Sequence, residues 1–99
     1  MIRGTTPKLE FSLPFDTSEI AEAFVTLSQN DQVIVDKALA DCKCDKRKLS
    51  VRLTQEDTLK LSCDCITDIQ IRVRTKGGDA LASNIMREDT YKILKDGVI

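Results

Sequence analysis

The stretch "IQIRVRT" (residues 69–75) alternates apolar and polar side chains with a period of two. In an extended strand, Ile69, Ile71 and Val73 lie on one face, and the polar side chains between them lie on the other. This pattern predicts a strand that is buried on one side and in contact with water on the other. It therefore indicates antiparallel β structure, which other segments must complete.

Two further segments have the same period. "LEFSLPF" (9–15) predicts a strand whose residues at 9, 11, 13 and 15 face the core, and "KLSVRLT" (48–54) repeats the pattern at 49, 51 and 53. Pro14 lacks the amide hydrogen that an interior strand must donate. The first strand is therefore expected at the edge of a sheet.

Turn residues separate the strands. Asn30-Asp31 predicts a hairpin turn, because both residue types tolerate the left-handed backbone conformation, and "KGGD" (76–79) predicts a second one. "DCKCDKRK" (41–48) is interpreted as a charged loop, and "DG" (96–97) as the end of the last segment.

Two segments fit either a helix or a strand. In "SEIAEAFVTLS" (18–28) the strand reading places Ala21, Ala23, Val25 and Leu27 on the inner face. We favour this reading, because a hairpin turn and the β-branched "VIV" (33–35) follow. "ALASNIMREDTYKILKDG" (80–97) is also interpreted as a strand, which pairs with 69–75 across the "KGGD" turn.

A short helical turn is expected after the strand at 48–54. Thr54 can accept hydrogen bonds from the first amides of "QEDTLKL", and Asp57 stands at the capping-box position. About seven short strands at regular spacing then predict one all-β domain over residues 1–99, an antiparallel immunoglobulin-like β-sandwich. The capped turn would connect the two sheets. The alternative is an α+β fold.

The amino-acid composition argues against several classes of function. The chain has 99 residues, a formal net charge of −1 and no His, so the commonest general base and imidazole metal ligands are missing. We expect no enzyme, no cofactor and no nucleic-acid partner. No apolar run approaches the roughly 18 residues of a membrane span, and no signal peptide is expected. A cluster of basic residues is interpreted as part of a solvated loop, and the alternative is that it binds an anionic partner. The cluster consists of Lys43, Lys46, Arg47 and Lys48.

The four cysteines form two Cys-x-Cys pairs, Cys42 with Cys44 and Cys63 with Cys65. In a strand, such a pair places the two Cα atoms about 6.6 Å apart, which is near the upper limit for a disulfide. Free thiols are the favoured interpretation in a reducing compartment. A disulfide between the pairs and a four-thiolate metal site remain open, and the four cysteines are the candidate metal ligands.

Several motifs together resemble a known protein family. They are "RGTTP" (3–7), "LPFD" (13–16), "VRLTQEDTLKL" (51–61), "IQIRV" (69–73), "ALASNI" (80–85) and "LKDGVI" (94–99). In these segments the chain resembles small proteins encoded by phages and prophages of Gram-positive, Clostridia-like bacteria, in the tail and minor structural gene region. The family is similar in style to the immunoglobulin-like domains of phage baseplate proteins. The resemblance implies no catalytic residue and no cofactor.

Together these observations predict a non-enzymatic phage structural or accessory protein. It would act by protein–protein contacts in or near the tail or baseplate, in the host cytoplasm or the virion. The expected contact sites are edge strands around Pro14 and in "YKILKDGVI" (91–99), which pair with other phage structural proteins or with a second copy. A small cysteine-based metal-binding or regulatory module is the alternative, and a factor that acts on the host is a third possibility.

Overall fold

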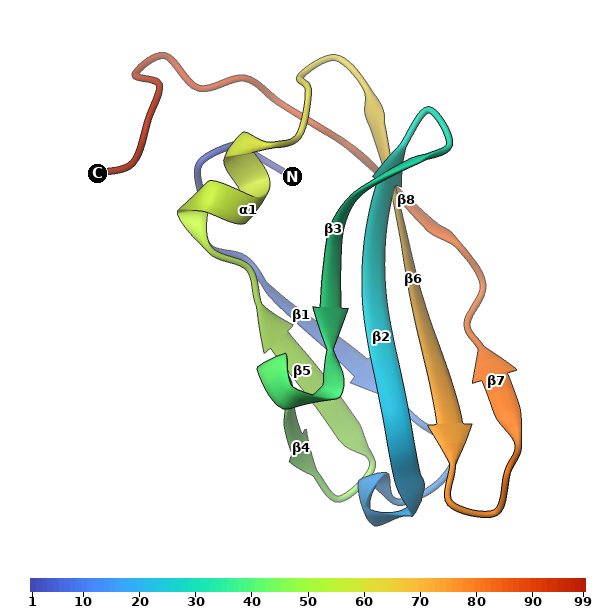
Figure 1. Cartoon of the computed structure of the whole chain (residues 1–99). Coiled ribbons are helices and arrows are strands. Elements are labelled where there is room, and N and C mark those ends of the chain that lie inside the picture. The colour runs from blue at the N-terminus through green and yellow to red at the C-terminus, as the bar shows by residue number, and fades with distance from the viewer.

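The computed structural model describes all residues, 1–99, as two antiparallel sheets and one short helix (Figure 1). The strands are β1 (Lys8–Ser12), β2 (Ile20–Gln29), β3 (Gln32–Ala38), β4 (Lys43–Asp45), β5 (Lys48–Arg52), β6 (Ile66–Thr75), β7 (Ala80–Ala82) and β8 (Met86–Asp89). The helix is α1 (Gln55–Leu59), and η1 (Thr17–Glu19) and η2 (Leu39–Asp41) are 3₁₀ turns. The predicted antiparallel all-β sandwich is confirmed.

The strand order follows the immunoglobulin pattern without its first strand. One sheet has the order β1-β5-β4, and the other has the order β3-β2-β6-β7, with β8 also paired to β6. These orders correspond to strands B-E-D and C′-C-F-G of immunoglobulin domains. In that fold strand A lies beside strand B, but here the outer edge of β1 has no neighbouring strand.

The core consists of the inward-facing residues of both sheets. Its thirteen buried apolar residues are Phe11, Ile20, Ala23, Val25, Leu27, Val35, Leu49, Val51, Leu53, Leu61, Ile69, Ile71 and Val73. The stretch at 69–75 lies in β6 as expected, with Ile69, Ile71 and Val73 buried and its two arginines exposed. Alternation with period two therefore identifies the inner face of this central strand correctly.

The ambiguous segment at 18–28 is mostly strand β2, as expected, but its first inward residue differs. Ile20 is buried and Ala21 is exposed, because the register with β6 shifts between Ile20 and Glu22. Such a bulge adds one residue to a strand and turns the preceding side chain to the other face. The predicted hairpin turn is confirmed, since Asn30 and Asp31 have φ of 51° and 63°.

Two predictions near β1 and β4 need correction. The first strand ends at Ser12, and Leu13 and Phe15 pack against the core from the segment that follows, which contains Pro14. The strand does lie at a sheet edge, as expected. Residues 41–48 are not a loop, because β4 forms a hairpin with β5 and the turn is made possible by Lys46 at φ 53°.

The C-terminal part contains less strand than predicted. Residues 80–97 do pair with β6, but only through β7 and β8. Between these two strands the Ser83 hydroxyl accepts the hydrogen bond of the Ile71 amide, at 3.1 Å, in place of a backbone carbonyl. The prediction of an edge strand at residues 91–99 is wrong. After β8 the Thr90 amide bonds the Cys65 carbonyl at 3.2 Å, and Tyr91 bonds Met1 and Arg3, but no strand continues beyond Tyr91.

Helix α1 connects the two sheets, as expected. The Thr54 hydroxyl accepts a hydrogen bond from the Asp57 amide at 3.1 Å, and the Asp57 carboxylate accepts one from the Thr54 amide at 2.9 Å. This is the predicted capping box. The same carboxylate lies 2.8 Å from the Lys37 ammonium on β3, so α1 is tied to the larger sheet. No helix here is long and apolar enough to cross a membrane.

Candidate functional site

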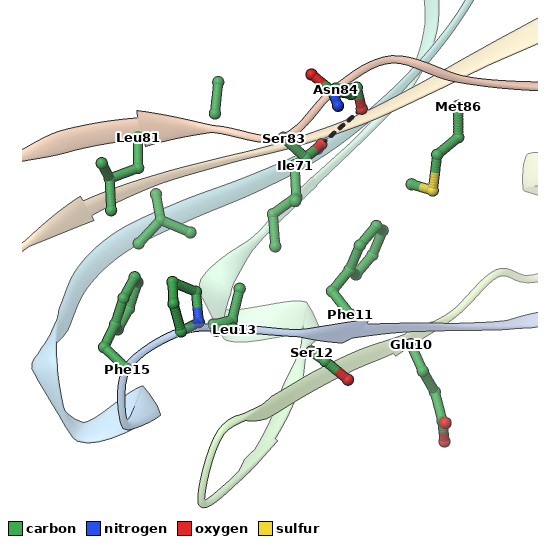
Figure 2. Close-up of a pocket in the computed structure, with 13 residues that line it drawn as sticks. Glu10, Phe11, Ser12, Leu13, Phe15, Ile71, Leu81, Ser83, Asn84 and Met86 are labelled. Carbon is green, nitrogen blue, oxygen red and sulfur yellow. Dashed lines mark hydrogen bonds between the residues drawn. The ribbon is translucent and has the colours of Figure 1, made fainter.

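A groove of about 550 Å³ opens between the two sheets where strand A is missing (Figure 2). Its apolar lining comes from three parts of the chain. These are β1 and the segment after it (Phe11, Leu13 and Phe15), β6 (Ile71 and Val73), and the chain beyond the "KGGD" turn (Leu81 and Met86). Most of the lining is therefore apolar, and several of these residues belong to the core itself. The groove is the point at which the core of the sandwich is open to solvent.

The groove is bordered on one side by the free backbone edge of β1. The Leu53 amide donates to the Pro7 carbonyl at 2.9 Å, and the Leu13 amide donates to the Arg47 carbonyl at 2.8 Å. In an antiparallel pair, residues that bond the neighbouring strand alternate with residues that point away from it. With the observed register of β1 and β5, the amides and carbonyls of Lys8, Glu10 and Ser12 point away from β5.

The second border is the free edge of β7. The Thr75 amide donates to the Asp79 carbonyl at 2.8 Å, and the Ser83 amide donates to the Ile71 carbonyl at 2.9 Å. By the same alternation, the backbone groups of Ala80 and Ala82 point away from β6. The groove therefore has an apolar interior between two rows of unpaired hydrogen-bonding groups.

A polar position lies between the two apolar ends of one wall. Figure 2 shows Ser83 and Asn84 between Leu81 and Met86. The Ser83 hydroxyl is already used, since it donates to the Asn84 carbonyl at 2.9 Å and accepts from the Ile71 amide. The Asn84 side chain is exposed and its amide makes no hydrogen bond within the chain. It is therefore free to bind a polar group of a ligand.

The two contact sites predicted from the sequence, around Pro14 and at residues 91–99, lie in different places relative to the groove. Pro14 lines the groove, so the edge predicted around it is part of the site. Residues 91–99 form no strand and do not line the groove. The sequence did not predict the groove. Its two borders, β1 and β7, are far apart in the sequence, and no local pattern indicates that no strand lies between them.

The two cysteine pairs do not meet. Cys44 lies on β4, opposite Leu49, and Cys42 directly precedes this strand. Cys63 and Cys65 lie in the loop between α1 and β6, at the opposite end of the sandwich (Figure 1). All four thiols are free, and no group of three or more Cys, Asp or Glu is placed to hold a metal ion. The four candidate ligands therefore share no common site in this fold.

Cys42 is the cysteine most closely tied to the fold. Its thiol donates a hydrogen bond to the Ala38 carbonyl at 3.3 Å, and its side chain packs against the core. Burial raises the pKa of the Cys42 thiol, and the nearby Cys44 and Asp41 raise it further. Because the thiolate is the reactive form, Cys42 is a poor nucleophile in the folded protein.

We therefore expect Cys42 to react with iodoacetamide more slowly than the exposed Cys44. The comparison requires the native protein at mildly alkaline pH, with the modified residues identified by mass spectrometry. In guanidinium chloride the rates of the two cysteines should become similar, because unfolding removes the burial. Equal rates in the native protein would contradict the buried environment of Cys42.

Comparisons of the chain with protein-family models, with curated proteins and with solved structures find no match. The immunoglobulin-like strand order therefore rests on the topology of this chain alone. The resemblance to small phage proteins stays a prediction.

Proposed function

We propose that the protein is a non-enzymatic structural or accessory component that binds partner proteins by strand addition in the groove. Following the resemblance, we place it in or near a phage tail or baseplate, with other structural proteins as partners. The observation that carries the proposal is the apolar groove between two unpaired strand edges. It occupies the position at which immunoglobulin domains have strand A.

An extended segment that enters the groove gains two kinds of interaction. Its backbone pairs with the outward-pointing groups of Lys8, Glu10 and Ser12 on β1. Its alternate side chains cover the apolar lining, and each well-buried aliphatic side chain contributes about 1.5–3 kcal/mol. Backbone pairing provides affinity for any extended partner, and the shape of the groove selects the side chains.

The outer edge of the smaller sheet is better protected against strand addition. β4 has only three residues, and its exposed Lys43 and Asp45 are charged. Short, charged edge strands resist pairing with other chains. On β1, the Lys8–Glu10 ion pair at 3.2 Å lies at the start of the strand, and the part from Glu10 onward borders the groove. Within this sheet, the groove side of β1 is therefore the accessible edge.

The proposal is tested by direct binding to purified proteins encoded by the genes that neighbour this one. We expect at least one of them to bind the wild-type chain, and Leu81→Glu to weaken that binding about tenfold or more, because a charge is then placed in an apolar contact. Val33→Glu is the matched control. Val33 is 64% exposed on β3, outside the groove, so this variant should bind as the wild type does. Absence of binding to all of them, or unchanged binding by Leu81→Glu, would contradict the proposal.

A further inference from the structure

The segment at residues 91–99 carries apolar side chains that its own chain leaves exposed. Leu94 is 96% exposed and Ile99 is 91% exposed, and Val98 is also exposed. A cluster of large apolar side chains in contact with water on one segment marks a candidate interaction surface. The segment is therefore a candidate partner for an apolar groove.

Tyr91 is held by two backbone hydrogen bonds, from its amide to the Met1 carbonyl at 2.8 Å and from the Arg3 amide to its carbonyl at 3.1 Å. The attachment of residues 94–99 is weak by comparison. The side-chain amide of Gln55 bonds the backbone of Ile99, accepting from the amide at 2.8 Å and donating to the carbonyl at 3.0 Å. Asp96 lies 3.6 Å from the Arg3 guanidinium, but its side chain is mostly exposed. Exposed ion pairs contribute at most about 1 kcal/mol. Release of residues 94–99 therefore costs little.

The side-chain pattern of the segment matches the pattern of the groove wall. In an extended strand, Leu94, Asp96 and Val98 lie on one face and span about 13 Å. The groove wall presents Leu81, then Ser83 and Asn84, then Met86. Both surfaces have the order apolar, polar, apolar. The unpaired Asn84 amide can donate to the Asp96 carboxylate, which provides the charge-assisted hydrogen bond that a buried carboxylate requires.

We propose that residues 94–99 of one copy bind in the groove of a second copy, as an added strand beside β1. This inference rests on the proposed function and names the chain itself as one partner. Leu94 and Val98 cover the two apolar ends of the groove, and Asp96 accepts a hydrogen bond from Asn84. The backbone of the segment pairs with the free groups of Lys8, Glu10 and Ser12.

Such a contact joins two different surfaces of the chain. In Figure 1 the C-terminal segment ends beside α1, whereas β7 lies near the opposite end of the sandwich. An interface between two different surfaces is heterologous, so each added copy offers a new groove and a new segment. Association therefore proceeds head to tail and gives rings or open chains.

Sedimentation velocity on the full chain tests the inference. We expect the wild type to associate with increasing concentration up to about 0.5 mM, a range that detects even weak contacts. Leu81→Glu, which alters the groove, and Leu94→Glu, which alters the segment, should each remain monomeric. An equimolar mixture of these two variants should form a dimer and nothing larger, because one intact groove and one intact segment are then present. Val33→Glu should associate as the wild type does.

The polar contact has its own test. Asn84→Asp places a carboxylate opposite Asp96 and should weaken association about tenfold, and Asp96→Asn in the same chain should restore it. A wild type that remains monomeric, a mixture that forms no dimer, or the absence of this rescue would each overturn the inference. If tail proteins still bind a monomeric wild type through the groove, the proposed function stands and only self-association is wrong.

Discussion

Replacement of Leu27 by alanine is expected to reduce the free energy of unfolding by about 3–4 kcal/mol. Leu27 is completely buried on β2, the strand that pairs with both β3 and β6, and lies opposite Val35 on one side and Ile69 on the other. The truncated side chain leaves a cavity between the two sheets, where rigid neighbouring strands limit collapse. Since domains of this size are stable by only about 5–15 kcal/mol, the loss is a large fraction of the total.

Urea unfolding monitored by circular dichroism measures this change, and the midpoint of thermal unfolding should fall by roughly 12–25 °C. Val33→Ala is the matched control. It also removes methyl groups from an aliphatic side chain, but at an exposed position of β3, and should change stability by less than about 0.5 kcal/mol. Equal effects of the two substitutions would contradict the placement of Leu27 in the core.

The second large effect is expected at Asp57. Its carboxylate caps the first turn of α1 and pairs with Lys37 at 2.8 Å, and both side chains are mostly buried. Asp57→Ala removes the cap and leaves a partly buried ammonium without a partner. Loss of a cap costs about 0.5–2 kcal/mol, and a buried charge left unpaired costs more. We expect a total loss of about 2–4 kcal/mol, measured by urea unfolding near neutral pH.

The contribution of Asp57 should depend on pH. Burial by itself raises the pKa of this carboxyl, but the hydrogen bonds from Lys37 and Thr54 and the charge of Lys37 outweigh it, so the pKa lies below its usual range. A carboxyl whose pKa is lowered by folding stabilises the folded state above its unfolded pKa, about 4, and loses that contribution as pH falls through its folded pKa.

The wild type and Asp57→Asn should therefore differ in stability near pH 6 and converge as the pH falls below about 4. Asn is similar in shape to the protonated carboxyl, so Asp57→Asn is the matched variant for this comparison. A stability difference that stays constant down to about pH 2 would show that the negative charge of Asp57 is not what stabilises the fold.

The elements that the sequence predicts well are those fixed by local pattern. Alternation with period two identifies the inner faces of β5 and β6, and the Thr54–Asp57 spacing identifies the capped turn. Each of these signals arises within a few residues. The inner face of β2 is predicted correctly from Ala23 onward but not at Ala21, because the bulge there depends on pairing with β6.

Features that depend on distant segments are not visible in the sequence. Gln29 is polar, yet it is buried, because its side-chain amide bonds the backbone of Ser62 in both directions, at 2.8 and 2.9 Å. The C-terminal residues have an apolar content that suits a strand, but beyond Tyr91, which bonds Met1 and Arg3, they pair with no strand of the chain. The groove likewise results from the absence of a strand beside β1, which only the assembled topology reveals.

Amide hydrogen exchange of β1, measured by NMR, tests most directly whether the groove is a strand-binding site. In the dilute, unassociated protein, the outward-pointing amides of Lys8, Glu10 and Ser12 should exchange rapidly, whereas those of Leu9 and Phe11, which point to β5, should be protected. When the protein associates or binds a tail component, we expect the three outward amides to become protected. If they continue to exchange rapidly while protection appears on β3 or β4, the partner binds elsewhere and strand addition in the groove is contradicted.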